Sequence, residues 1–293
     1  MATGDTFLAN VEAGLNTTVG AARTTREYPS DVMSRLVDRQ TLTPGTGTGY
    51  REFLAAQLNA QNYGETDTID APQLLSGSIL TFTPQLTAIL TFVGKRVAER
   101  LSSKAFETFG QLAQQAIDRK GDEDGLAMAA SATTTLSGTG STLVGGVIAA
   151  AGTRITSNVN EPSNAPLAAV LHGYQIADLY SEVTAGIGTY PMPEGYTTET
   201  WKSGFKGMIN NVNIYEDGNI AIDSTPDARG MVFSKMGLLK VQGISPWTET
   251  EPKPSKGYGG VNIYLKDEYV YGERSPGNWL YGVLSDATVP TSL

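Results

Sequence analysis

The sequence contains no cysteine and a single histidine, and both scarcities exclude kinds of chemistry. With 0 cysteines among 293 residues, a disulfide framework and a thiolate metal site are impossible. His172, the one histidine, is the only possible centre for a Ser-His-Asp triad or a His-based metal site. It stands between an apolar run and the start of a helix, where a capping role is ordinary. We therefore interpret His172 as structural.

Long apolar runs and an excess of positive charge are also missing. The longest apolar run, LVGGVIAAAG, is about half of the roughly 20 residues that a membrane span needs. The first residues lack the basic start and apolar core of a secretory signal, so we expect synthesis in the cytoplasm and no membrane contact. The net charge of −9 argues against holding nucleic acid by neutralising phosphates. An acidic wall can still enclose DNA and leave it mobile.

One glycine-rich stretch, GTGSTLVGGVIAAAG at residues 138–152, resembles a phosphate-binding loop without its context. The preceding AMAASATTTLS is not the buried strand that such loops follow, and no lysine follows the glycines. We interpret the stretch as a flexible joint that leads into a helix of small residues from Ser141 to about Arg154.

No other pattern indicates catalysis. Adjacent Asp267 and Glu268 would point to opposite sides of a strand and cannot act on one bond. The acids at 122–124 lack the alternate spacing of a calcium loop, and no G-x-S-x-G turn occurs. We predict no catalytic, cofactor-binding or metal-binding residues, and no enzyme.

The element pattern is mixed. Apolar spacing of three and four predicts a long helix that starts at Ser102 or Ser103 and that Gly121 can end, after which DED begins either a loop or a second helical section through GLAMAAS. Leu86, Ala88, Leu90 and Phe92 alternate as one face of a strand. The polar segment 60–73 is too long for a tight turn and is predicted to protrude at the end of two strands. From residue 165 onward, PLAAVLH predicts a buried strand, GYQIADLYSEV a helix, and FKGMINNVNIYE, NIAID, RGMVFSKMGLLKVQ, VNIYLKDEYVYGE and WLYGVLSDA short strands.

The order of these stretches resembles the major capsid proteins of tailed bacteriophages, the Hong Kong 97-like fold. The likeness rests on LTFTPQLTAILTFVGKRVAERL, PLAAVLHGYQIADL, FKGMINNVNIYE, RGMVFSK and YGVLSDATVP, and it covers nearly the whole chain. It implies an α+β fold with an N-terminal arm, an extended β-hairpin loop, a long spine helix in a peripheral domain, and an α/β axial domain. The implied ranges are 1–34 for the arm, 35–93 for the extended loop and peripheral strands, 94–160 for the spine helix and the rest of the peripheral domain, 161–275 for the axial domain, and 276–293 for a C-terminal return to the peripheral domain.

The resemblance also implies partners. The chain would self-assemble as hexamers and pentamers in an icosahedral lattice that encloses double-stranded DNA without sequence-specific binding, as part of a virion assembled in the host cytoplasm. It would work with a portal, a decoration protein where one exists and, because the arm is short, a separate scaffolding protein. No lysine occurs between Arg51 and Lys95, which excludes a lysine cross-link from the extended loop.

The expected subunit contacts involve the loop tip. Its acids would dock against basic residues of a neighbour, or would merely keep the loop soluble. Because exposed ion pairs contribute only about 0–1 kcal/mol each, apolar groups of the loop would add to the contact. The candidate residues are Tyr63, Glu65, Asp67, Ile69 and Asp70 on the loop, Arg23 and Arg26 in the arm, and Lys95, Arg96 and Arg100 ahead of the long helix.

Two other functions remain open from the sequence. A shell of the encapsulin type, which encloses an enzyme cargo, would share the fold and would differ in its contents. A secreted β-rich hydrolase or adhesin is supported only by the glycine and tyrosine content of the C-terminal half. The missing signal and the missing catalytic site argue against this second alternative.

Overall fold

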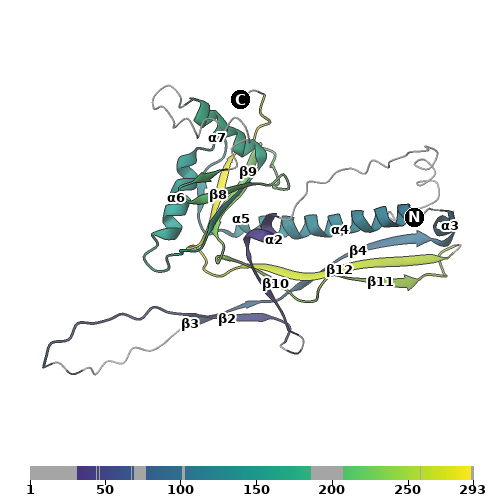
Figure 1. The fold of residues 1–293 in the computed structure, drawn as a ribbon, viewed down its shortest axis with the longest axis horizontal. Helices are drawn as coiled ribbons and strands as arrows, with labels where there is room; N and C mark the ends of the chain where they lie inside the picture. The colour runs from purple at the N-terminus through teal and green to yellow at the C-terminus, as the bar shows by residue number, and fades with distance from the viewer. Residues whose placement is uncertain are drawn as a thin grey trace.

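The computed structural model describes residues 32–43, 45, 47–66, 68, 77–100, 103–185, 207–257 and 259–291. Within these residues the chain is an α+β protein with a five-stranded sheet, a six-stranded sheet and a two-stranded hairpin (Figure 1). Nearly all of the expected arm, residues 1–34, lies outside the described part. The arm's last residues enter helix α2, Val32–Leu36.

The five-stranded sheet, called the long sheet below, carries the longest helix along one face. Its central strand is β12, Gly260–Glu273, which pairs with β4, Gln85–Gly94, on one side. On its other side β12 pairs with β11, Trp247–Pro252, and then with β10, Leu238–Gln242, which in turn pairs with β1, Asp38–Thr41. Helix α4, Ser103–Leu126, runs parallel to this sheet, and α3, Lys95–Arg100, lies at its far end (Figure 1).

The six-stranded sheet has helices against both faces. Its order is β5-β13-β9-β6-β8-β7, with β6 at Leu167–Leu171 buried at all five positions. A strand covered on both faces reads as a continuous apolar run, which explains LAAVL. The other strands are β5 (Thr135–Ser137), β7 (Met208–Ile209), β8 (Val212–Glu216), β9 (Asp227–Ser234) and β13 (Leu280–Asp286).

Two apolar cores cover the two faces of this sheet. On one face, α6 (Gly145–Thr156) and α7 (Gly173–Ala185) bury Ile148, Ile155 and Leu179 against it. On the other face, α2, α5 (Met128–Ser131) and the end of α4 pack with residues of the long sheet. The second core therefore joins the two sheets into one body.

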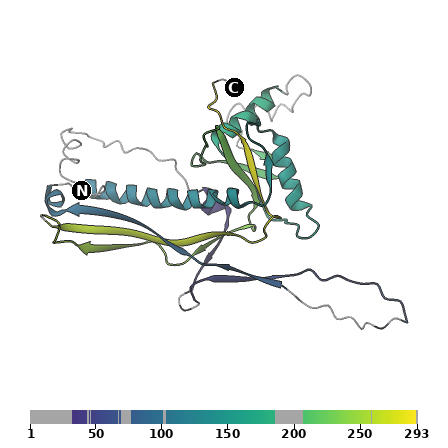
Figure 2. The same cartoon turned by 180° about the vertical axis from the view of Figure 1, so that it is seen from behind.

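The hairpin of β2, Tyr50–Ala55, and β3, Gly77–Phe82, projects from this body (Figure 2). The sequence predicted a protruding loop between two strands at residues 60–73, and the described part of that loop, residues 60–66 and 68, does lie between these strands. The hairpin points away from the end of the long sheet where α3 lies (Figure 1).

Several local predictions were wrong at their boundaries. Helix α4 passes through Gly121 and ends at Leu126, because the residues beyond Gly121 pack against α2 and β12. Helix α6 begins at Gly145, not Ser141, since the preceding residues form an extended connection. The NIAID stretch forms only an isolated bridge from Ile222 to Ala228.

Strand pairing crosses the expected ranges, which stay a prediction. β10 and β12, from the range 161–275, lie in one sheet with β4, from the range 35–93. β13, from the range 276–293, lies between β5, from the range 94–160, and β9, from the range 161–275. Apolar alternation predicts a strand but not its sheet, because pairing partners are distant in sequence.

Candidate subunit-contact surfaces

The outward face of the hairpin carries two large apolar side chains. Phe53 and Ile79 lie directly opposite each other in the antiparallel register, so their side chains share one face. Their exposed fractions are 57% and 64%. A two-stranded hairpin is only marginally stable alone, and exposed apolar groups on it are stabilised when another surface covers them. This face is therefore a candidate contact surface.

The base of the hairpin is fixed to the long sheet. The ring of Phe82 lies on Gly272 so closely that a Cβ added there would be 2.1 Å from Cε1 of the ring. Arg274 lies between two carboxylates, with Nη1 2.6 Å from Oδ2 of Asp38 and Nε 2.8 Å from Oε2 of Glu52. Arg274 is only 9% exposed, and desolvation by burial, which opposes its charge, is outweighed by these two partners, which raise its pKa. The hairpin thus projects from a rigid base.

The outer face of the long sheet, opposite α4, has an apolar stripe on β4. Leu86 and Leu90 are 59% and 55% exposed. The predicted alternation on β4 is confirmed. Leu86 lies on the face that points away from α4, whereas Ile89 and Val93 line the space between the sheet and the helix. In the described part of the chain, β4 has a strand partner on one edge only, β12. An exposed edge with apolar residues is a template for pairing with another chain.

The β11 and β12 side of the same face is polar and internally paired. Lys266 forms an ion pair with Glu249 and lies above the ring of Trp247. Hydrogen bonds from Lys266 and Trp247 lower the pKa of Glu249. Tyr264 donates its hydroxyl to Glu251 at 2.9 Å. Because Glu249 and Glu251 already have partners within the chain, the apolar stripe on β4 is the better candidate for contact with another chain.

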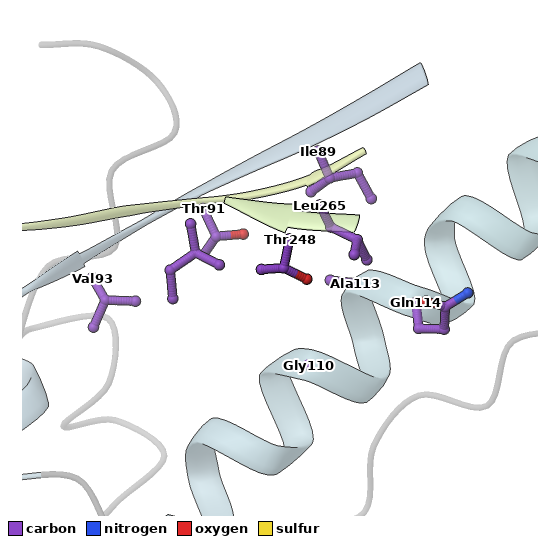
Figure 3. Close-up of a pocket in the computed structure, with 9 residues that line it drawn as sticks. Ile89, Thr91, Val93, Gly110, Ala113, Gln114, Thr248 and Leu265 are labelled. Atoms are coloured by element: carbon purple, nitrogen blue, oxygen red, sulfur yellow. The ribbon is translucent and has the colours of Figure 1, made fainter. Parts of the chain in front are cut away.

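A groove of 390 Å³ separates α4 from the long sheet (Figure 3). Gly110 and Ala113 contribute the helix wall, and their small side chains leave the space between the helix and the apolar sheet residues unfilled. A Cβ added at Gly110 would meet no atom within 4 Å. The sheet wall consists of Ile89, Thr91, Val93, Thr248, Ile263 and Leu265, and Gln114 completes the lining.

The glycine-rich stretch does not offer an anion site, because the chain's own carboxylates occupy it. The backbone N–H of Gly140 donates to Asp227 at 2.8 Å, and that of Gly145 donates to Glu182 at 2.6 Å. Between them, the N–H of Leu143 donates to Asp178 at 3.0 Å. The N–H groups that would bind a phosphate are thus used internally, in agreement with the structural interpretation.

His172 has the capping role expected from its position. Its Nδ1 accepts the backbone N–H of Tyr174 at 3.1 Å, in the first turn of α7. Its own backbone N–H donates to Gln175 at 3.0 Å. Burial lowers the pKa of His172.

The described ranges contain no cluster of three or more His, Cys, Asp or Glu side chains suited to a metal ion. Among the helices that the structure describes, none is long and apolar enough to span a membrane.

The predicted loop-tip contacts are only partly described. Tyr63 is 41% exposed, its hydroxyl donates to Gln61, and Glu65 is exposed in a turn. Lys95 and Arg96 begin α3 and are exposed. Because the hairpin points away from α3 within one chain, the structure does not bring the two groups together (Figure 1). Asp67, Ile69, Asp70, Arg23 and Arg26 lie outside the described residues, as does the side chain of Arg100.

Sequence reasoning missed the residues at the hairpin base. Gly272 and Arg274 are 190 or more positions from Phe82 and Asp38 in sequence, so no local pattern links them. The only available signal was an arginine directly after a long strand, two positions beyond a glycine that interrupts the strand's apolar alternation.

No protein-family model and no curated protein sequence matches the chain. Solved structures do match. A chain of the cyanophage P-SCSP1u capsid is 11% identical with a TM-score of 0.70, over 95% of each chain. A chain of the cyanophage Pam1 capsid is 10% identical with a TM-score of 0.70, over 99% of this chain and 100% of that one.

The SrpI encapsulin of Synechococcus elongatus PCC 7942 also matches, at 10% identity and a TM-score of 0.62, over 93% of this chain and 95% of that one. The matches extend over both sheets and the long helix, since they leave almost no residue of either chain uncovered. At these identities the likeness concerns the fold, and the similar structures include several phage capsids and heads. The chain therefore has the fold of bacteriophage capsid proteins.

Proposed function

We propose that the chain is a major capsid protein that self-assembles into the icosahedral head shell of a tailed phage. One observation carries the proposal: nearly the whole chain superposes on nearly the whole length of phage capsid chains, with no large addition on either side. A projecting hairpin with exposed Phe53 and Ile79 supports repeated contacts between copies. In a closed lattice, many modest contacts act together.

In this proposal the fold is of the Hong Kong 97-like type. The hairpin is the extended loop, α4 is the spine helix, the long sheet belongs to the peripheral domain and the six-stranded sheet to the axial domain. The net charge of −9 suits a wall that encloses double-stranded DNA without binding its sequence. A portal, a scaffolding protein and a decoration protein are further partners of such a shell, and the virion is its location.

The contact we propose joins the hairpin of one copy to the body of a neighbour. Phe53 and Ile79 supply apolar area, about 1.5–3 kcal/mol for each side chain that becomes fully buried. Glu65 and the other acids of the loop tip face the basic start of α3, with Lys95 and Arg96. The ion pairs set the position of the contact, and the apolar pair supplies most of its free energy.

The first test is negative-stain electron microscopy of the purified protein beside size-exclusion chromatography. Closed shells, or pentamers and hexamers, are expected. A protein that stays strictly monomeric at every concentration, also when its scaffolding protein is present, would contradict the proposal. Shells that contain DNA support the phage function. Shells that co-purify with a dedicated enzyme would instead support a compartment, the second candidate that the encapsulin match favours.

A matched pair of variants tests the hairpin contact. Replacing Phe53 and Ile79 together by serine should abolish assembly while the monomer keeps its thermal stability, because both side chains are exposed in the subunit. The control replaces Arg51 by glutamine and Thr81 by serine. These two residues lie opposite each other and form the next pair on the same face of the hairpin. Normal assembly of the first variant would refute the contact.

A further inference from the structure

Two buried aspartates meet where three parts of the chain join. Asp122 belongs to α4 and is 2% exposed, and Asp217 follows β8 and is 0% exposed. The third part is the root of the arm, since α2 packs beside α4 and a Cβ added at Gly125 would lie 2.9 Å from Cβ of Met33. The pair therefore connects the long helix, the six-stranded sheet and the arm root.

Hydrogen bonds account for three of the four carboxylate oxygens of this pair. Oδ1 of Asp122 accepts the backbone N–H of Met33 at 3.1 Å. Oδ1 of Asp217 accepts the backbone N–H of Asn219 at 2.9 Å, and the side-chain amide of Asn219 reaches Oδ2 of Asp122 at 3.4 Å. Oδ2 of Asp217 is buried and has no hydrogen-bond donor among the described residues. The carboxyl group of Asp122 is the neighbour with which the Asp217 carboxyl group can form a hydrogen bond.

The charged groups that act on Asp217 are both acids, Asp122 and Glu216. Tyr271 of β12 interacts electrostatically with Asp122, Tyr269 and Arg39. Lys240 of β10 lies above the Tyr269 and Tyr271 rings, with Nζ 5.0 Å and 5.4 Å from their centroids. Asp124 is engaged with Lys120 and with the hydroxyl of Tyr269.

We propose that Asp122 and Asp217 share one proton, and that loss of this proton loosens the junction between α4, the six-stranded sheet and the arm root. Two ionised carboxylates in contact inside a protein repel each other, and burial penalises both charges. Burial and the hydrogen bond with Asp122 raise the pKa of Asp217 to about 7. The junction is thus closed in acid and opens as the pH rises toward neutrality. This property belongs to the single subunit and does not depend on the proposed function.

A shared proton fits the donor count better than a divalent cation does. Calcium takes about 6–8 oxygen ligands, and magnesium needs about six in an octahedron. Here Oδ1 of each aspartate already accepts a backbone N–H, and Oδ2 of Asp122 lies 3.4 Å from the side-chain amide of Asn219, which leaves Oδ2 of Asp217. A single proton on this oxygen, donated to Asp122, satisfies it.

The sign of the pH dependence follows from linkage. The folded state holds the proton of Asp217 up to about pH 7, whereas an unfolded aspartate loses it near the ordinary aspartate pKa of 3.8. Between these values the folded state binds more protons, so its stability falls as the pH rises. The equilibrium constant for opening the junction should increase by up to about tenfold per pH unit in this window and level off above it.

Hydrogen exchange tests the junction directly. The protection of the Met33 amide, which donates to Asp122, is measured from pH 4.5 to 8.5 after correction for the intrinsic exchange rate. In the wild type this protection should fall across the window. The Asp217→Asn variant, which supplies a permanent donor to Asp122, should show a flat profile. Asp118→Asn, an exposed acid one turn earlier on α4, is the control and should follow the wild type.

Two further measurements test the shared proton on the wild-type chain and do not depend on folding of the variant. Infrared spectra of the wild type should show a protonated carboxyl band at pH 6 that disappears at pH 9. Addition of Ca²⁺ or EDTA should leave the exchange profile unchanged. A missing band, a profile that Ca²⁺ shifts, or a pH-dependent profile in Asp217→Asn would overturn the shared proton.

Discussion

Replacing Gly272 by alanine should dislodge the hairpin from the body. The added Cβ would lie 2.1 Å from Cε1 and 2.2 Å from Cδ1 of Phe82, whereas carbon atoms in contact lie about 3.5–4.0 Å apart. The ring must therefore move by about 1.5 Å. Such overpacking costs about 1–3 kcal/mol. A shift of that size would also stretch the 2.8 Å contact between Arg274 and Glu52 beyond hydrogen-bond distance.

The assay is thermal unfolding of the purified subunit or capsomer, with assembly yield as a second readout. A loss of about 1–3 kcal/mol corresponds to a fall in Tm of roughly 2–10 °C for a chain of this size. Replacing Phe82 by leucine in the same chain makes room for the methyl group, so the double variant should be more stable than the sum of the single effects predicts.

Gly94→Ala is the matched control, because a Cβ there meets only Phe92, at 3.9 Å. If Gly272→Ala unfolds at the same temperature as Gly94→Ala, the close contact between Phe82 and Gly272 does not hold the hairpin, and the reasoning fails.

Three other substitutions have definite expected outcomes. Gly110→Ala should stabilise the subunit by about 0.5–1 kcal/mol in thermal unfolding, since alanine favours the helix and the groove has room for it. His172→Ala should cost about 1 kcal/mol through loss of the α7 cap, and His172→Asn should retain most of it. Because burial lowers the pKa of His172 below 6.5, its contribution is lost as the pH falls through that value, and urea titrations of His172→Asn should lack this acid sensitivity. Arg274→Met should cost about 2 kcal/mol in denaturant titrations, between the values for exposed and buried ion pairs, and Asp38→Asn in that background should recover part of the loss.

The elements could be predicted from the sequence where their signal is local. The alternation on β4, the apolar LAAVL of β6 and the spacing of α4 each follow from which side chains face the interior. The end of α4 could not be predicted, because Gly121 is a local stop signal that distant packing overrides. The sheet to which β13 belongs could not be predicted from the sequence either, because tertiary contacts set its pairing with β9 and β5.

The candidate contact surfaces could likewise be predicted only where their signal is local in the sequence. The protruding loop followed from its polar composition and length, and its acids and aromatic residue were visible in the sequence. The apolar pair on its outward face, Phe53 and Ile79, was not, because the two residues become neighbours only through the register of the hairpin. The pair of Asp122 and Asp217 was hidden for the same reason. Each lies in an ordinary acidic stretch, and only the fold removes both from water.

The continuous strand β12 has a mechanical consequence. Its 14 residues span about 45 Å, from Gly260 beside the end of β4 near Lys95 to Glu273 beside Arg274. Hydrogen bonds to β4, β11 and β10 stiffen it along this length. A pull on the hairpin at Gly272 is therefore transmitted as tension along a single backbone to the opposite end of the long sheet. In the proposed shell, a subunit held by neighbours at both ends would carry tension between them along β12.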